Sequence, residues 1–374
     1  MLKPHSLRPQ EAGQLADLIG SIFGLSHKYS NEQMIRALRR PTSARNSWVI
    51  ADNDKVLSHI RVVYDTVSVH GCRFGVASIG CVATLPEYRG QGYAGTILDM
   101  LLEQMEAKGT GVLIVSGDRG LYRRVHCVPS SHLLTGNLRA EAMWKSTKDV
   151  SVRLVDPGDW PLLAPLYQGE PVRFIRRANF IPRLPFWWNF DRPNLWLVEK
   201  ACQPAAYVLL SKTAPEAKKQ KSVVKSIREY AGSRVALVEV LPAICAKEGL
   251  EELRFSIPRH DMDFALLLRE RGVKLGPKSP DGTIRIVNFP RLMRRLRPYI
   301  RERLPDADLR KLRFEQERGR HSITYGEETQ VLSPSETTWL VLGGTNSPSL
   351  SGELERVLQK IFPIPFPMPG FNYI

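Results

Sequence analysis

Three glycines and an arginine stand between an apolar run and a helix-like stretch of this chain, in the segment "TLPEYRGQGYAGTIL" (84–98). A helix N-terminus offers free N–H donors and the positive end of the helix dipole. Small residues let those donors approach a phosphate closely. The segment therefore predicts a binding site for an anionic group. Its candidate binding residues are Arg89, Gly90, Gln91, Gly92, Tyr93, Ala94 and Gly95.

The same glycines permit a second interpretation. Read literally, they form a G-x-G-x-x-G string, and Asp118 follows about where a ribose-binding carboxylate stands in a dinucleotide-binding fold. In that fingerprint the first glycine directly follows the strand, whereas here "LPEYR" intervenes. A third, purely structural interpretation is a glycine turn that begins a helix.

The surrounding elements decide which interpretation fits better. Helical spacing is visible at 11–24 and 31–40, where Pro41 ends the pattern. Strand-like runs follow at 47–52, 55–69 and 72–84, joined by turns at Asn53-Asp54 and His70-Gly71. After the loop come a helix ending at Gly109 and the short strand "GVLIVSG". Long hairpin strands before the loop disfavour a parallel dinucleotide-binding sheet.

The phrase "V-A-x-x-P-x-Y-R-G-Q-G-Y-A" resembles motif A of the GNAT (Gcn5-related) N-acetyltransferases, R/Q-x-x-G-x-G/A, with Arg89, Gly92 and Ala94 at its three positions. The resemblance implies that the anion is the pyrophosphate of coenzyme A. It also implies that the backbone of Val82, Ala83 and Thr84 pairs with the pantetheine arm as an added strand would.

Further stretches resemble the Eis (enhanced intracellular survival) acetyltransferases. "SGDRGLYRRVHC" (116–127) is similar to the family segment that carries its general acid, and Tyr122 matches that tyrosine. This similarity places Gly117 and Asp118 beside the cofactor. "IRIVNFPRLMRRL" (284–296) resembles the family's strand-to-helix passage into a sterol-carrier-like domain.

The chain ends in "FPIPFPMPGFNYI", which we call the tail (362–374). Its four alternating prolines cannot continue a helix and favour extended geometry, so the tail reaches up to about 40 Å. Its apolar and aromatic character predicts docking rather than disorder. The Eis resemblance implies that the tail enters the active site and that the carboxylate of Ile374 is the general base, with His126 as the rival base.

The two roles make consistent chemistry. A carboxylate can take a proton from the attacking amine. A phenol with a pKa of about 10 is protonated at neutral pH and can donate its proton to the leaving thiolate. No covalent enzyme intermediate is needed, and no metal is implied. The resemblance implies acetyl-CoA as cosubstrate and a primary amine of a small molecule or peptide as acceptor, with aminoglycosides among the family's acceptors.

The composition narrows the classes of partner. The net charge is +15 and the segment 291–303 carries six arginines, which we interpret as a solvated helix face. No zinc-finger spacing, RNP pattern or helix-turn-helix signal supports nucleic-acid binding. No apolar run is long enough for a membrane span and no secretory signal is visible, so we expect a cytoplasmic protein. The resemblance implies a homo-oligomer, a trimer or hexamer.

Residues after about 150 weakly repeat the pattern of the first 116 residues. Residues 151–169 echo 6–24, "NLWLVEKACQPAAYVLLSK" reads as a hairpin, and 233–258 reads as strand, helix, strand without the glycines. The basic stretch 212–233 reads as an exposed loop or helix. We therefore expect an α+β protein with tandem GNAT folds, built of mixed, mostly antiparallel sheets flanked by helices, and a C-terminal sterol-carrier-protein-like α/β domain.

The expected domains are 1–148, catalytic, 149–288, degenerate, and 289–374, which delivers the tail. The expected function is acetyl-CoA-dependent N-acetylation. Two alternatives stay open: a non-catalytic shell that binds acetyl-CoA or an anionic partner, and a dinucleotide-dependent enzyme.

Overall fold

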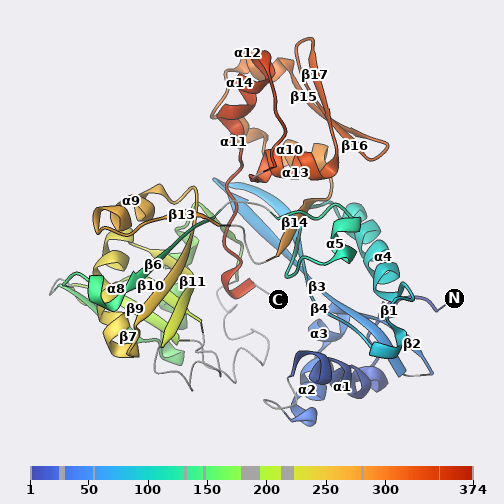
Figure 1. The fold of residues 1–374 in the computed structure, drawn as a ribbon, viewed down its shortest axis with the longest axis horizontal. Helices are drawn as coiled ribbons and strands as arrows, with labels where there is room; N and C mark the ends of the chain where they lie inside the picture. The colour runs from blue at the N-terminus through green and yellow to red at the C-terminus, as the bar shows by residue number, and fades with distance from the viewer. Residues whose placement is uncertain are drawn as a thin grey trace.

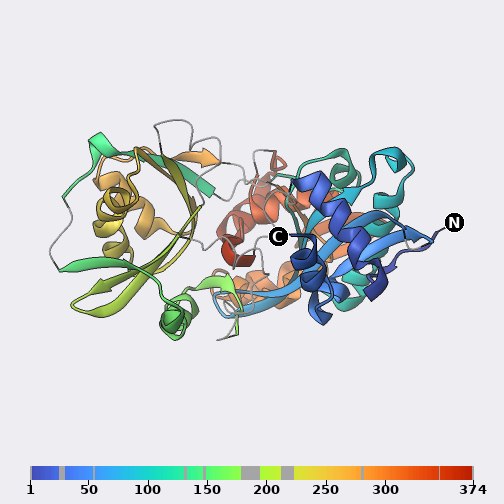
Figure 2. The ribbon, with the colours of Figure 1, turned by 90° about the horizontal axis from the view of Figure 1, so that it is seen from below.

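The computed structural model describes residues 2–24, 30–53, 55–129, 133–145, 149–177, 194–211, 223–278, 282–344 and 346–372. The chain is mixed α+β and builds three sheets, each with its own helices (Figure 1). The tail runs from the third sheet's helices down between the two larger units, and the view from below also places its end between them (Figure 2).

The first sheet has the order β1-β2-β3-β4-β5-β14, with β8 paired to β3. Only β4 and β5 pair in parallel; the other pairings in this sheet are antiparallel. Its strands are β1 His5–Ser6, β2 Ser47–Asp52, β3 Lys55–Val69, β4 Cys72–Thr84, β5 Thr110–Val115, β8 Val172–Phe174 and β14 Thr283–Ile286. Its helices are α1 Ala12–Phe23, α2 Asn31–Leu38, α3 Pro41–Asn46, α4 Tyr93–Lys108 and α5 Gly120–Arg124.

These elements confirm the helices and strands expected before residue 116; the expected turn at Asn53-Asp54 includes Asp54, which lies outside the described residues. The turn at His70 and Gly71 has positive φ at both residues, 45° and 85°, which suits the twist of a two-residue hairpin. Helix α4 ends at Gly109, whose φ of 72° is the left-handed conformation of a glycine cap. Pro41 ends the α2 pattern as expected and begins the further short helix α3.

The second sheet has the order β13-β6-β12-β11-β10-β9-β7. Its strands are β6 Leu133–Arg139, β7 Val150–Leu154, β9 Asn194–Lys200, β10 Gln203–Leu210, β11 Val224–Gly232, β12 Glu252–Pro258 and β13 Gly276–Lys278. Its helices are α6 Trp160–Gln168, α8 Arg234–Glu248 and α9 Met262–Glu270. The unit β11-α8-β12, with parallel strands, has the same form as β4-α4-β5.

Two interpretations of the sequence are wrong in this unit. The apolar start of 233–258 is helical, because Ser233 caps α8 by accepting a hydrogen bond from the backbone N–H of Ala236. Residues 236–242 are all buried, so no polar face reveals the helical period. The strand before the helix, β11, lies instead in the stretch that reads as an exposed basic loop.

Two strands cross between the larger units. Strand β6 follows the first-sheet elements in sequence but pairs with β12 of the second sheet, and β14 follows the second-sheet elements but pairs with β5 of the first. The two units are thus tied by exchanged strands, which the repeat alone did not predict.

The third sheet, β15-β16-β17, comprises Leu312–Glu317, Arg320–Tyr325 and Glu328–Leu332. The helices of this part are α10 Phe289–Arg295, α11 Arg297–Arg301, α12 Asp306–Lys311, α13 Pro334–Leu342 and α14 Gly352–Ile361. Its core is continuous with one face of the first sheet, through residues such as Val67, Val76 and Phe289. The single basic helix expected at 291–303 is two short helices, α10 and α11.

Candidate active site

Strands β4 and β5 separate beside the glycine loop. They pair as far as Ile79 and Val115, and the backbone N–H of Ser116 still donates to the Ile79 carbonyl over 3.2 Å. Beyond that point β4 continues to Thr84 and pairs with β3 alone. The edge of β4 that faces away from β3, which includes Val82, Ala83 and Thr84, is therefore open at the mouth of the gap.

A bulge shapes this end of β4. The register with β3 shifts between Arg61, opposite Gly80, and His59, opposite Ala83, and Cys81 has a φ of 49°, unusual for a non-glycine residue. The Nδ1–H of His59 donates to the Cys81 carbonyl over 2.8 Å. Burial lowers the pKa of His59 to about 3, so the ring is neutral at physiological pH. His59 thus holds the bulge without carrying charge.

The glycine loop leads into an uncapped helix. Gly92 is the N-cap of α4, no side chain caps the helix, and the first backbone bond within it is donated by Thr96 to Gly92. The N–H groups of Tyr93, Ala94 and Gly95 therefore have no acceptor within the helix. Gly90 and Gly92 have φ of 80° and 82°, and a methyl group at either would meet no atom within 4 Å. The loop is an open cradle of backbone donors.

Side chains around this cradle add positive charge. Arg89 is exposed, and its Nε donates to the Thr84 carbonyl over 3.4 Å. Arg124 of α5 lies at the same end of α4: its guanidinium bonds Asp99 at 2.8 Å and would contact a methyl group on Gly95 at 3.4 Å. Sequence reasoning missed Arg124, because only the fold brings α5 to the start of α4.

Tyr122 lies in the short helix α5, which follows β5 in the chain. Its side chain is 5% exposed and packs in the core between the first sheet and α4. Gly117 is next to it, since a methyl group there would lie 3.3 Å from the tyrosine ring. Burial raises the pKa of Tyr122, so its phenol stays protonated well above neutral pH. This is the protonation state that a general acid needs.

Asp118 does not point freely into the site. Both of its oxygens accept hydrogen bonds from Arg123, each over 2.8 Å, and this partner lowers the pKa of the carboxyl. The literal G-x-G-x-x-G interpretation is also disfavoured, because the strand before the glycines is parallel to β5 only and antiparallel to β3, whereas a dinucleotide-binding sheet is mostly parallel.

The docked tail reaches the opposite face of the first sheet from Tyr122. Its apolar residues Phe362, Ile364 and Phe366 are buried, which confirms docking. Near its end, the amide of Asn372 donates to Asp65 of β3 over 3.1 Å and accepts from Arg176 over 2.8 Å. Ile374 itself lies outside the described residues, so its role as base stays a prediction.

A buried ion pair anchors the tail from the second sheet. Glu229 of β11 accepts from both terminal nitrogens of Arg176, over 2.7 and 2.6 Å, and from the Tyr207 hydroxyl over 2.6 Å. The backbone N–H of Phe371 donates to the same carboxylate over 3.0 Å. Gly370 has a φ of 49°, and a methyl group there would overlap Glu229. The tail therefore fits this pair only with glycine at 370.

His126 is less well placed to be a base for the acceptor. It is exposed, and the charged groups that act on it are Arg285 and His321 rather than any residue of the tail. Burial lowers its pKa, with Arg285 adding to the effect. Among the described residues no cluster of metal-ligating side chains is present, and no helix is long and apolar enough to span a membrane.

Comparisons with known proteins agree with this geometry. Residues 3–127 match the family model of the acetyltransferase (GNAT) domain. No curated protein sequence matches the chain. Its fold is similar over nearly the whole length to that of solved N-acetyltransferases.

Three such structures illustrate the similarity. A GCN5-related N-acetyltransferase from Kribbella flavida has a TM-score of 0.66 at 14% identity, and one from Anabaena variabilis has 0.65 at 15%, each with 97% of both chains covered. Eis1 from Mycobacterium abscessus has a TM-score of 0.63 at 12% identity, with 96% of this chain and 97% of that chain covered. Residues 3–127 are accordingly a GNAT acetyltransferase domain, and the chain as a whole shares its fold with Eis1 and the two GCN5-related N-acetyltransferases.

Proposed function

We propose that the protein transfers an acetyl group from acetyl-CoA to a primary amine of a small molecule or peptide. The observation that carries the proposal is the uncapped N-terminus of α4, preceded by Gly90 and Gly92 at positive φ and placed beside the open edge of β4. A pyrophosphate suits the free N–H groups, and a pantetheine amide suits the unpaired strand edge. Arg89 and Arg124 are the cations that would face the phosphates.

The chemistry proceeds by direct attack. The amine nitrogen bonds to the thioester carbonyl carbon, the carbon–sulfur bond breaks, and Tyr122 gives its proton to the leaving thiolate. A base takes the proton that the amine loses. A thiol nucleophile is not required, and Cys127 is poorly suited to be one because burial raises its pKa to about 12.

For the base we propose the carboxylate of Ile374. Asn372 is fixed at Asp65, and two further residues extend at most about 7 Å from there. Arg61 projects from the same face of β3 as Asp65, because the two positions are an even number of residues apart with no bulge between them. A terminal carboxylate near this buried arginine would stay ionised, as a base must.

Truncating the tail tests this assignment. Deleting Ile374 moves the carboxylate back by about 3.3 Å and is expected to lower turnover at least a hundredfold, whereas Ile374→Val keeps the carboxylate and most of the activity. A C-terminal tag should be as harmful as the deletion, and acetyl-CoA binding should survive all three changes. Normal turnover of the tagged protein together with an inactive His126→Phe variant would transfer the role of base to His126.

An acceptor screen by thiol release separates the enzyme from a non-catalytic shell. Aminoglycosides belong in the panel because the resemblance to the Eis acetyltransferases suggests them. Tight acetyl-CoA binding without release on any amine would favour the shell.

The finer architecture is also a proposal. We propose a catalytic unit at 1–148, a degenerate copy at 149–288 and a sterol-carrier-like unit at 289–374. The second unit suits this role because β11 enters α8 through Gly232 and Ser233 without a glycine loop, and Arg234 at the helix start pairs with Glu170 and Asp261.

We further propose a homo-oligomer, a trimer or hexamer. Light scattering at micromolar concentration tests it, and a monomer would contradict it.

A further inference from the structure

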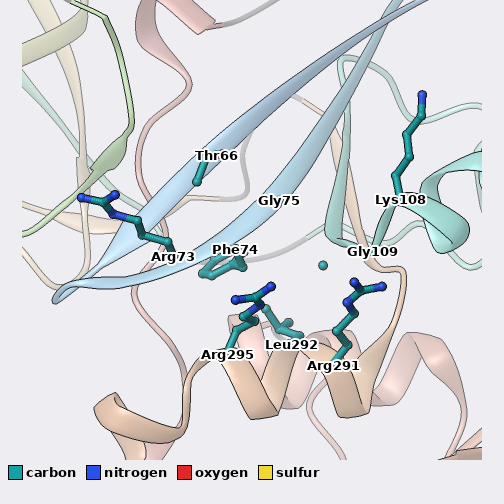
Figure 3. A pocket seen from close by; sticks show the side chains of 10 residues that line it. Thr66, Arg73, Phe74, Gly75, Lys108, Gly109, Arg291, Leu292 and Arg295 are labelled. Carbon is teal, nitrogen blue, oxygen red and sulfur yellow. The ribbon is translucent and has the colours of Figure 1, made fainter.

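A second cationic site lies at the far end of α4. A cavity of about 280 Å³ opens where the C-terminal end of α4 and the hairpin end of β3 and β4 meet helix α10 (Figure 3). Two of the six arginines in 291–303 line it, and neither the glycine loop nor the tail uses them. Its basic lining residues are Arg73, Lys108, Arg291 and Arg295.

The cavity's arginines are not neutralised by the protein. Among the described residues, no carboxylate lies within ion-pairing distance of Arg73, Arg291 or Arg295, and none of the three side chains donates a hydrogen bond to another group. Arginines elsewhere in the chain behave differently: Arg123 and Arg153, for example, each bond both oxygens of an aspartate. In Figure 3 the guanidinium groups of Arg291 and Arg295 face one small space, whereas that of Arg73 points away from them; the two like charges attract an anion to this space.

The end of α4 accounts for only part of this charge. A helix C-terminus carries about half a negative charge, and Arg291 lies directly against it at Gly109. Half a negative charge does not offset the full positive charges of both Arg291 and Arg295. The side chain of Lys108 also lines the cavity, but its ammonium group points away from the cavity in Figure 3 and lies 4.2 Å from the centre of the Tyr64 ring.

Glycines shape the wall that faces the arginines. Gly75, Gly109 and Gly111 line the cavity, and a methyl group on Gly109 would overlap the Arg291 guanidinium. The buried side chains of Phe74 and Leu292 form a firm apolar floor. In Figure 3 the guanidinium groups of Arg291 and Arg295 both rise from α10 toward this wall. The arrangement is a cradle formed by backbone on one side and planar cations on the other.

We propose that this cavity binds a small, multiply charged phosphate compound. Guanidinium groups pair with phosphate oxygens through two parallel hydrogen bonds, which favours phosphate over a compact halide. The volume admits a pyrophosphate group with a modest attached moiety and excludes a nucleic-acid chain from the interior. Helix α4 has 16 residues, so this site and the glycine loop are about 24 Å apart. Such a ligand would bridge the first sheet and α10, and so would brace the C-terminal third.

Calorimetry on the full chain tests the proposal. The protein is first saturated with coenzyme A to fill the glycine loop, and sodium pyrophosphate is then titrated at 150 mM NaCl. We expect one binding event, weakened at least tenfold by Arg295→Gln and by Arg291→Gln. Arg294→Gln is the matched control, because Arg294 is exposed on the same helix but does not line the cavity. It removes the same charge and should leave the affinity unchanged.

Thermal denaturation provides a second readout. Pyrophosphate should raise the melting temperature of the CoA-saturated wild type and of Arg294→Gln, but not that of Arg295→Gln. Absence of binding to the CoA-saturated wild type would overturn the proposal. Equal weakening by Arg294→Gln and Arg295→Gln would also overturn it, because net charge rather than the cavity would then attract the ion. None of these measurements depends on acetyl transfer.

Discussion

The Gly92→Ala variant should show whether the space beside Gly92 is used by the cofactor, provided that the effect of backbone strain is measured separately. Gly92 has a φ of 82°, and Gly249, the C-cap of α8, has a φ of 62°; a methyl group at either position meets no atom within 4 Å. Alanine in this left-handed conformation costs about 1–2 kcal/mol. Gly92→Ala and Gly249→Ala should therefore lose similar stability, a fall in melting temperature of about 2–8 °C.

The two variants should differ in acetyl-CoA affinity. The space beside Gly92 is empty of protein atoms, so the added methyl group weakens binding only if the cofactor occupies that space. We expect a loss of at least tenfold, about 1.4 kcal/mol, for Gly92→Ala and none for Gly249→Ala by calorimetry. Equal affinities in the two folded variants would refute the assignment of the loop to pyrophosphate. Loss in both would show that strain, not contact, governs binding.

Three further outcomes are expected. Tyr122→Phe should lower kcat by about 10²–10⁴-fold and leave the acetyl-CoA affinity unchanged. Because burial raises the pKa of Tyr122, the kcat of the wild type should not decline with rising pH until beyond about pH 10. Glu229→Gln replaces the carboxylate that accepts two hydrogen bonds from the buried Arg176, and it should cost about 3 kcal/mol of unfolding free energy or expose the tail to proteolysis. Glu315→Gln, at an exposed position, is the control, and equal stability of the two variants would contradict the anchor. The pKa of His59 is lowered from 6.5 to about 3 in the folded protein, so between these pH values the unfolded chain binds one more proton than the folded chain. The free energy of unfolding therefore falls by up to about 1.4 kcal/mol per pH unit from pH 6.5 toward 3. Denaturation curves of His59→Gln should show a weaker dependence of stability on pH in this range.

Local patterns predicted the elements around the loop because each carried its own signal. The alternation in β3 and β4, the turn at His70 and Gly71, and Gly109 at the end of α4 are all properties of neighbouring residues. Helix α8 lacked such a signal, since residues 236–242 are all buried and show no amphipathic period. Without that period, its apolar run could not be distinguished from a buried strand.

Parts of the candidate site depend on contacts between distant segments. His59 and Arg61 did have a signal, two ionisable residues at alternate positions of an apolar strand, which indicates one face turned to a special environment. The bulge that His59 supports, at Cys81, could not be seen from either strand alone. Nor could Arg124 be assigned to the phosphate end of α4, because its approach depends on the path of the chain after β5.

The direction of the tail is determined by all three parts of the molecule. Proline spacing predicted an extended arm, but it gave no direction. That direction comes from Gly370, whose left-handed conformation brings the N–H of Phe371 onto Glu229 of the second sheet, and from Asn372, which is held at Asp65 of the first. Each of these contacts joins residues more than 100 positions apart, so no local pattern reveals them. If the terminal carboxylate is the base, its position depends on Glu229, a residue of the second unit that has no other role in the proposed chemistry. A second unit without its own cofactor loop would then be retained because it positions the terminus for the first.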